Sequence, residues 1–113
     1  MSILIYGAYG YTGELIAREA VSRDLDVVLA GRNGTKTRGL GAMLGADTRV
    51  FEVADAVDHL DDIDILLNCA GPFVKTYGPL VEACLETGTH YLDITGEFPV
   101  FEDLAERDRE AEK

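Results

Sequence analysis

The sequence has few lysines, few cysteines and no long apolar run. The last two shortages argue against a membrane-spanning protein and against a cysteine-based metal site. No apolar run approaches the roughly 20 residues that a membrane-spanning helix needs. The N-terminus lacks the basic start and cleavage region of a secretory signal, so we expect a cytoplasmic protein without a membrane span. The two cysteines, Cys69 and Cys84, lack C-x-x-C spacing and are interpreted as small buried hydrophobic residues. With both histidines isolated as well, no metal site is predicted.

Basic residues are also scarce, since 10 Lys and Arg stand against 21 Asp and Glu, and the formal net charge is −11. A phosphate polymer would be repelled, which argues against a nucleic-acid partner. Only three of the basic residues are lysines, Lys36, Lys75 and Lys113. Acid-rich, lysine-poor surfaces suit a salt-rich cytoplasm, where counterions screen self-repulsion. We therefore predict a salt-adapted protein; the alternative is an ordinary acidic one.

Three glycines at intervals of three, Gly7, Gly10 and Gly13, lie between an apolar run and a helical pattern. One glycine permits a turn with positive φ, one admits a pyrophosphate, and one lets the helix pack on the strand. The first-turn N–H groups of that helix then attract an anion. The spacing differs by one residue from G-x-G-x-x-G, so these roles are assigned by analogy, and a purely structural turn is the alternative. The predicted phosphate loop comprises Gly7, Ala8, Tyr9, Gly10, Tyr11, Thr12 and Gly13.

Strand and helix patterns alternate along the 113 residues, which predicts one α/β domain of β-α-β units. Strands are expected over residues 2–6, 25–30, 48–53, 63–68 and 90–94, and helices over 12–22, 35–44, 77–87 and 98–112, with a short helix or turn over 56–60. The first helix has Leu15, Ile16 and Ala20 on its apolar side. The predicted fold is a Rossmann-type doubly wound parallel sheet of about five strands, in order 3-2-1-4-5, with helices on both faces.

The residues after the second strand bear on the choice of cofactor. An NAD-preferring site places Asp or Glu about 20 residues after the loop, whereas this chain has Arg32, 19 residues past Gly13. A guanidinium forks onto a 2′-phosphate, so NADP is favoured over NAD; the alternative is a solvated arginine. Asn33 is a second candidate for this pocket, with Thr35 and Lys36 weaker.

Two further strand ends suggest contacts with the rest of the dinucleotide. After the third strand, Asp55 and Ala56 are candidates for the adenine side, although Asp55 is equally suited to cap a helix. Small residues follow the fourth strand and leave room for the ribose and nicotinamide. These nicotinamide-side candidates are Ala70, Gly71, Pro72 and Phe73.

No catalytic acid or base stands out. None of the five tyrosines has a lysine four residues later, and no G-x-S-x-G or Walker lysine occurs. Asp93 and Glu97 follow the fifth strand and either face a substrate or cap the last helix. The catalytic residues stay unassigned, and we expect the isolated domain to be inactive.

Five stretches together resemble the saccharopine dehydrogenase family, most closely its saccharopine reductase-like and trans-acting enoyl reductase-like branch. They are residues 7–13 (GAYGYTG), 30–33 (AGRN), 68–73 (NCAGPF), 77–84 (YGPLVEAC) and 91–97 (YLDITGE). The resemblance implies an NAD(P)-binding domain that full-length members follow with a larger substrate and dimerisation domain. Family members act on varied substrates, including amino-acid-derived imines and lipid enoyl groups, so no substrate is carried over.

The sequence therefore predicts the N-terminal cofactor-binding domain of an NADP-dependent oxidoreductase, spanning residues 1–113 and ending before a substrate and dimerisation domain. Its small-molecule substrate would reach the cofactor through that further domain. A surface left without its neighbouring domain would favour association between copies. The alternative is a non-catalytic NADP(H)-binding redox sensor, and a fold that binds no nucleotide is a third reading.

Overall fold

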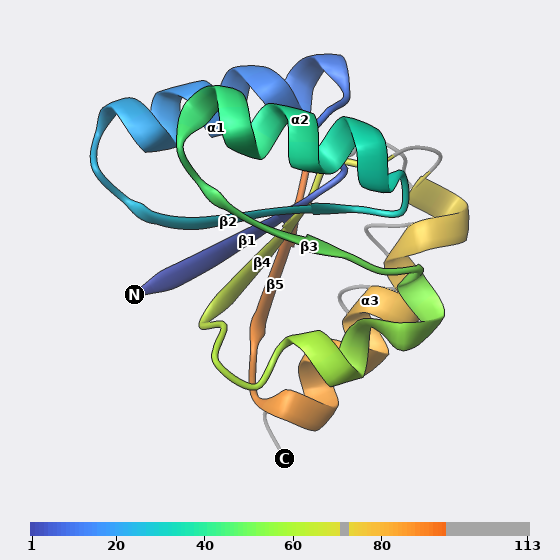
Figure 1. Ribbon diagram of the computed structural model, residues 1–113. Coiled ribbons are helices and arrows are strands. Elements are labelled where there is room, and N and C mark those ends of the chain that lie inside the picture. Colours follow the sequence, from blue (N-terminus) through green and yellow to red (C-terminus); the bar gives the residue numbers. More distant parts are fainter. Residues whose placement is uncertain (71–72, 95–113) are drawn as a thin grey trace.

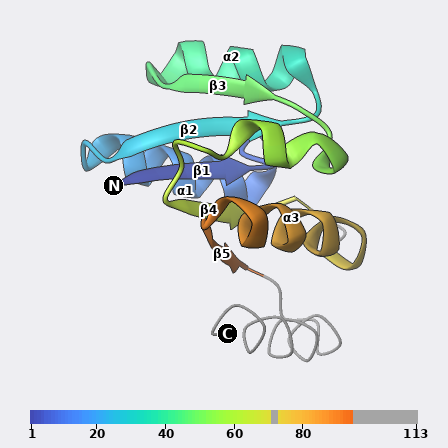
Figure 2. The same cartoon turned by 90° about the horizontal axis from the view of Figure 1, so that it is seen from below.

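A computed structural model of the protein describes residues 1–70 and 73–94 (Figure 1). In chain order its elements are β1 (Ser2–Tyr6), α1 (Tyr11–Ser22), β2 (Asp26–Gly31), α2 (Gly34–Leu44), β3 (Asp47–Val50), the 3₁₀ helix η1 (Val53–His59), β4 (Ile65–Asn68), α3 (Phe73–Thr87) and β5 (His90–Asp93). The strands form one parallel sheet in the order β3-β2-β1-β4-β5 (Figure 2). The predicted α/β class and strand order are confirmed.

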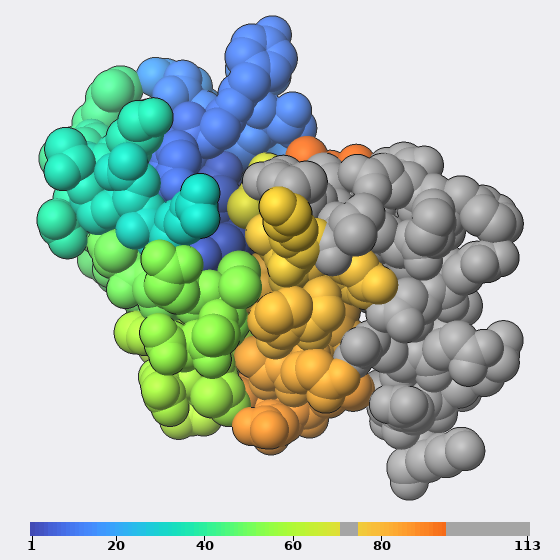
Figure 3. Space-filling view, turned by 90° about the vertical axis from the view of Figure 1, so that its right-hand side faces the viewer, coloured from blue at the N-terminus to red at the C-terminus, as the bar shows by residue number. Residues whose placement is uncertain are grey.

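Helices cover both faces of the sheet, α1 and α2 on one and η1 and α3 on the other (Figure 1). The space-filling view shows η1 packed beside α3 (Figure 3). Alternate residues of β1 point to opposite faces: Leu4 and Tyr6 join the core under α3, and Ile5 joins the core under α1. Because both faces are buried, the central strands are apolar between their ends, and their polar residues, Ser2, Asp26 and Asn68, are terminal.

The structure shifts several predicted boundaries. The helix predicted over residues 77–87 begins four residues earlier, at Phe73, and contains Pro79 in its interior. The third strand ends at Val50, because Val53 already begins η1. The helix predicted over residues 98–112 and the candidate Glu97 lie outside the described residues.

The buried face of α1 differs from the expected one. Gly13, Ala17 and Ala20 are buried, whereas Leu15 is 54% exposed. Small residues on the buried face let α1 approach the sheet closely. Leu15 lies outside this face, where its side chain is exposed to solvent. Assigning Leu15 to the apolar side was therefore wrong.

The two cysteines are free thiols, with Cys84 buried in the core and Cys69 half-buried. Burial raises the pKa of Cys84 to about 12 and that of Cys69 to about 11, so neither is a reactive thiolate. Within residues 1–70 and 73–94, no group of three or more His, Cys, Asp or Glu is arranged to hold a metal ion. None of the helices in this part of the chain has the length and apolar character to span a membrane.

Candidate functional site

The sheet order reverses between β1 and β4, and in a doubly wound sheet the ligand-binding crevice lies at the carboxyl ends of the strands at such a point. Backbone hydrogen bonds tie the segments that follow the strands to one another. Gly7 N–H donates to the Ala30 carbonyl at 2.8 Å, and Cys69 N–H donates to the Tyr6 carbonyl at 2.8 Å. The predicted phosphate loop thus lies between the end of β2 and the end of β4.

Two of the loop glycines are required by the protein itself. Gly7 has φ +79°, and a Cβ there would come within 2.7 Å of the Ala70 nitrogen and α-carbon. A Cβ on Gly13 would run into the Gly7 carbonyl oxygen. Gly7 therefore makes the tight turn, and Gly13 lets α1 pack against the loop.

Gly10 differs from the other two. Among the described atoms, a Cβ on Gly10 would meet only the Gly7 carbonyl oxygen, at an ordinary 3.5 Å. Gly10 is also the N-cap of α1, with φ −72° and no side-chain hydrogen bond to the helix. The next two residues, Tyr11 and Thr12, are exposed. The start of α1 thus offers first-turn N–H groups and open space, which suits a phosphate.

Basic side chains gather where β2 leads into α2. Arg32 is exposed, and Asn33 caps α2 by accepting a hydrogen bond from the Lys36 N–H at 3.0 Å. A Cβ on Gly34 would lie 2.7 Å from a guanidinium nitrogen of Arg38, which therefore folds over the first turn of the helix. Cations beside a helix N-terminus favour an anion.

Arg38 was not among the residues predicted for this pocket. It lies four positions after Gly34 within α2, so the helical repeat returns its side chain to the start of the helix. That spacing is a signal in the sequence that reveals Arg38 once the helix start is known.

Tyr9 links the glycine loop to the start of α2. A Cβ on Gly31 would come within 2.5 Å of the Tyr9 ring, so the absence of a side chain at Gly31 makes room for that ring. The Lys36 ammonium lies 5.8 Å from the ring centroid, within range of a cation–π contact.

Tyr6, the last residue of β1, is buried and bonds to the segment after β3. Its hydroxyl donates to the Phe51 carbonyl at 2.9 Å, and Phe51 N–H donates to the Gly31 carbonyl at 3.1 Å. Burial, reinforced by the negative charge of Glu52 and opposed by Arg32, raises the pKa of Tyr6 to about 12. Tyr6 is therefore a neutral structural group at neutral pH.

The candidates after β3 differ in exposure. Asp55 is exposed in the first turn of η1, and its N–H donates to the Glu52 carbonyl at 2.9 Å. Glu52, not Asp55, is the N-cap of η1. Ala56 is fully buried in the core, so an adenine contact at this position would fall to its backbone.

A buried polar cluster, which the sequence did not reveal, lies at the ends of β4 and β5. Asn68 is fully buried; its side-chain oxygen accepts from Ala70 N–H, and its nitrogen donates to Thr76 and Tyr91, each at 3.0 Å. The Thr76 hydroxyl donates to the Ala70 carbonyl, and the Tyr91 hydroxyl to Asp93, again at 3.0 Å. In the sequence, the signal for this cluster was Asn68, a polar residue at the end of an apolar strand.

The other candidates after β4 are only partly placed. Ala70 is half-buried and lies against Gly7. Gly71 and Pro72 lie outside the described residues, and Phe73 begins α3 with a side chain that is not described.

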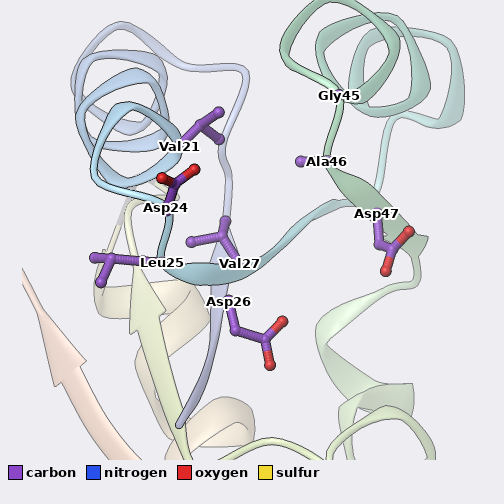
Figure 4. A pocket seen from close by; sticks show the side chains of 8 residues that line it. All are labelled: Val21, Asp24, Leu25, Asp26, Val27, Gly45, Ala46 and Asp47. Carbon is purple, nitrogen blue, oxygen red and sulfur yellow. The ribbon is translucent and has the colours of Figure 1, made fainter.

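A separate cavity of about 290 Å³ lies at the opposite end of the sheet, where β2 and β3 begin (Figure 4). Asp24, Asp26 and Asp47 are among the residues that line it. Three carboxylates would repel the phosphates of a dinucleotide, so this cavity is not part of the candidate site.

Residues 3–113 match the family described as the saccharopine dehydrogenase NADP binding domain. A trans-acting enoyl reductase of Mycobacterium leprae is 35% identical over 108 residues, which include 84% of this chain. A probable mitochondrial saccharopine dehydrogenase-like oxidoreductase of Arabidopsis thaliana is 36% identical over 117 residues, again including 84% of the chain. In each case the match covers 25% of the relative's own length.

Among solved structures, apo saccharopine dehydrogenase (L-Glu forming) from Saccharomyces cerevisiae superimposes with a TM-score of 0.78 at 19% identity. The match covers 91% of this chain and 23% of the yeast chain. At that identity the likeness supports the fold alone.

Proposed function

The chain belongs to the saccharopine dehydrogenase family as an NADP-binding domain, and we propose that it holds NADPH for an oxidoreductase whose substrate is bound by other parts of a longer protein. The described geometry is consistent with this proposal. The crevice lies at the carboxyl ends of β1 and β4, where a doubly wound sheet binds its ligand.

The observation that carries the proposal is the space at Gly10. The protein's own packing accounts for Gly7 and Gly13 but leaves a side chain tolerable at Gly10. A glycine at that position is explained when a phosphate lies against the first turn of α1.

The proposed contacts follow the order of the strands. The phosphate loop, residues 7–13, holds the pyrophosphate through its backbone N–H groups. Arg32 binds the 2′-phosphate, with Asn33 holding the first turn of α2 in place and Lys36 and Arg38 adding positive charge. The adenine side falls to Asp55 and Ala56, and the nicotinamide side to Ala70, Gly71, Pro72 and Phe73.

The preference for NADP over NAD rests on the end of β2. An exposed arginine follows Gly31, where an NAD site would carry a carboxylate for the ribose hydroxyl. A guanidinium forms charge-assisted hydrogen bonds with the additional phosphate, which NAD lacks.

The chemistry that the cofactor supplies is hydride transfer from the dihydronicotinamide. This chain spans about a quarter of the length of the curated relatives that it matches. We propose that the substrate-binding groups and the subunit contacts belong to a further domain, and that residues 1–113 alone turn over no substrate. We also propose a cytoplasmic, salt-rich setting, because the formal charge is −11.

Titrating the ¹⁵N-labelled chain with NADPH while recording amide chemical shifts tests the proposal. Shifts are expected at residues 7–13 and at Arg32, on the crevice side of the sheet. Shifts confined to the cavity around Asp24 and Asp47, or no shifts at all, would argue against it.

A further inference from the structure

We propose that Asn68 and Thr76 form a clamp on Ala70 that positions the wall of the crevice on which the nicotinamide half of the cofactor rests. Both are positioning residues that act through the backbone of Ala70. The inference builds on the proposed function, because it assigns a role within the same NADP site.

The clamp is needed because Ala70 lies beyond the sheet. β4 ends at Asn68, so strand pairing does not hold the backbone of Ala70. Two side chains hold it instead: the Asn68 oxygen accepts from its N–H, and the Thr76 hydroxyl donates to its carbonyl, both at 3.0 Å. Both polar groups of this alanine are therefore satisfied by side chains.

The cluster also fixes which way the Asn68 amide faces. Its nitrogen donates to Thr76 and Tyr91, so its oxygen is the atom turned toward Ala70. Rotating the amide by half a turn would set its N–H₂ group against the Ala70 N–H, and two donors cannot bond. Asn68 itself is fully buried, and a buried hydrogen bond is stronger than an exposed one.

Ala70 packs directly against the glycine loop. A Cβ on Gly7 would lie 2.7 Å from the nitrogen and the α-carbon of Ala70. The segment after β1 and the segment after β4 are therefore in contact at this point. Releasing Ala70 would let these segments separate on the β4 side. The basic side chains around Arg32 lie on the β2 side and would keep their positions, because Gly7 N–H remains bonded to the Ala30 carbonyl.

This asymmetry gives a direct test with two ligands, NADPH and 2′-phospho-ADP-ribose, which lacks only the nicotinamide. Thr76→Val removes the hydroxyl and keeps the side-chain shape. Calorimetry should show NADPH binding weakened about tenfold, because both hydrogen bonds of this hydroxyl, from Asn68 and to the Ala70 carbonyl, are lost. Binding of 2′-phospho-ADP-ribose should stay within about twofold of wild type. Thr76→Ser restores the hydroxyl and should restore NADPH affinity.

Thr87→Val is the matched control, since Thr87 lies at the far end of the same helix and donates to the Ala83 carbonyl. It should leave both affinities unchanged. Equal losses of both ligands in Thr76→Val, or no loss of either, would overturn the clamp while leaving the proposed function intact. If the wild-type chain bound neither ligand, the proposed function would fail, and the clamp with it.

A measurement on the wild-type chain guards against a variant that does not fold. Amide hydrogen exchange at Ala70 should be slow, because its N–H is bonded to a buried side chain outside any strand. Exchange as fast as in an open loop would overturn the clamp without any substitution.

Discussion

Gly7 and Ala70 lie in direct backbone contact across the point where the sheet order reverses. A Cβ on Gly7 would come within 2.7 Å of the Ala70 nitrogen and α-carbon, and Gly7 already has φ +79°. The contact joins the segment after β1 to the segment after β4. Substitutions in the glycine loop therefore separate what the fold requires from what a ligand requires.

The first prediction contrasts Gly7→Ala with Gly10→Ala. Gly7→Ala should destabilise the fold by about 3 kcal/mol, because it combines positive φ with a backbone clash. Gly10→Ala should cost less than about 1 kcal/mol, since a methyl group fits there and only the cap is poorer. Urea unfolding of the two variants measures both values.

Gly10→Ala also has an expected effect on ligand binding. Gly10→Ala should remain folded yet bind NADPH at least about tenfold more weakly, because its methyl takes up space proposed for a phosphate. Wild-type affinity in a folded Gly10→Ala variant would refute the assignment of the phosphate site.

The second prediction concerns Arg32. Arg32→Ala should weaken NADPH binding by about 10- to 100-fold, the range for a hydrogen bond to a charged group, and leave NADH binding nearly unchanged. Arg23→Ala is the matched control: it removes the same charge from an exposed i,i+4 ion pair with Glu19 on α1. Equal losses for the two cofactors in Arg32→Ala would contradict the 2′-phosphate assignment.

The third prediction concerns alkaline pH. Burial raises the pKa of Tyr6 from 10.0 to about 12, so its stabilising effect is complete below pH 10 and is lost as the pH rises through 12. At neutral pH, Tyr6→Phe should be less stable by about 1 kcal/mol, because the Phe51 carbonyl loses its donor. Urea midpoints measured between pH 8 and 12 should show this difference shrinking; a constant difference would contradict the raised pKa.

The fourth prediction tests salt adaptation. Raising KCl from about 0.1 M to about 1 M should increase Tm by about 5 °C, because counterions screen the self-repulsion of the net negative charge. Replacing Asp26 and Asp47, which line the same acidic cavity, with asparagine should raise Tm at low salt and reduce the response. A Tm that is independent of KCl would count against a salt-rich setting.

The alternation of strand and helix patterns predicted the fold class, and the usual doubly wound topology supplied the strand order. The glycine loop and the elements beside it were predicted from one local stretch. An apolar strand, a glycine trio and a helix are contiguous, so neighbouring residues determine them. The roles of Gly7 and Gly13 follow from the same stretch and agree with the packing.

Features that depend on side-chain hydrogen bonds between elements were harder to predict. The start of α3 was predicted at residue 77, whereas α3 begins at Phe73 and has Pro79 in its interior, where proline is ordinarily unfavourable. Thr76 in its first turn bonds to Asn68 and Ala70, and such contacts override local propensity. The same contacts make up the clamp; its residues all lie within positions 68–76, but no motif in that stretch indicates their hydrogen bonds.

Calorimetric titration of the purified chain with NADPH and with NADH tests whether this chain binds NADP as the family does. NADPH should bind at one site and at least about tenfold more tightly than NADH. No binding of NADPH, or an equal or tighter affinity for NADH, would contradict it.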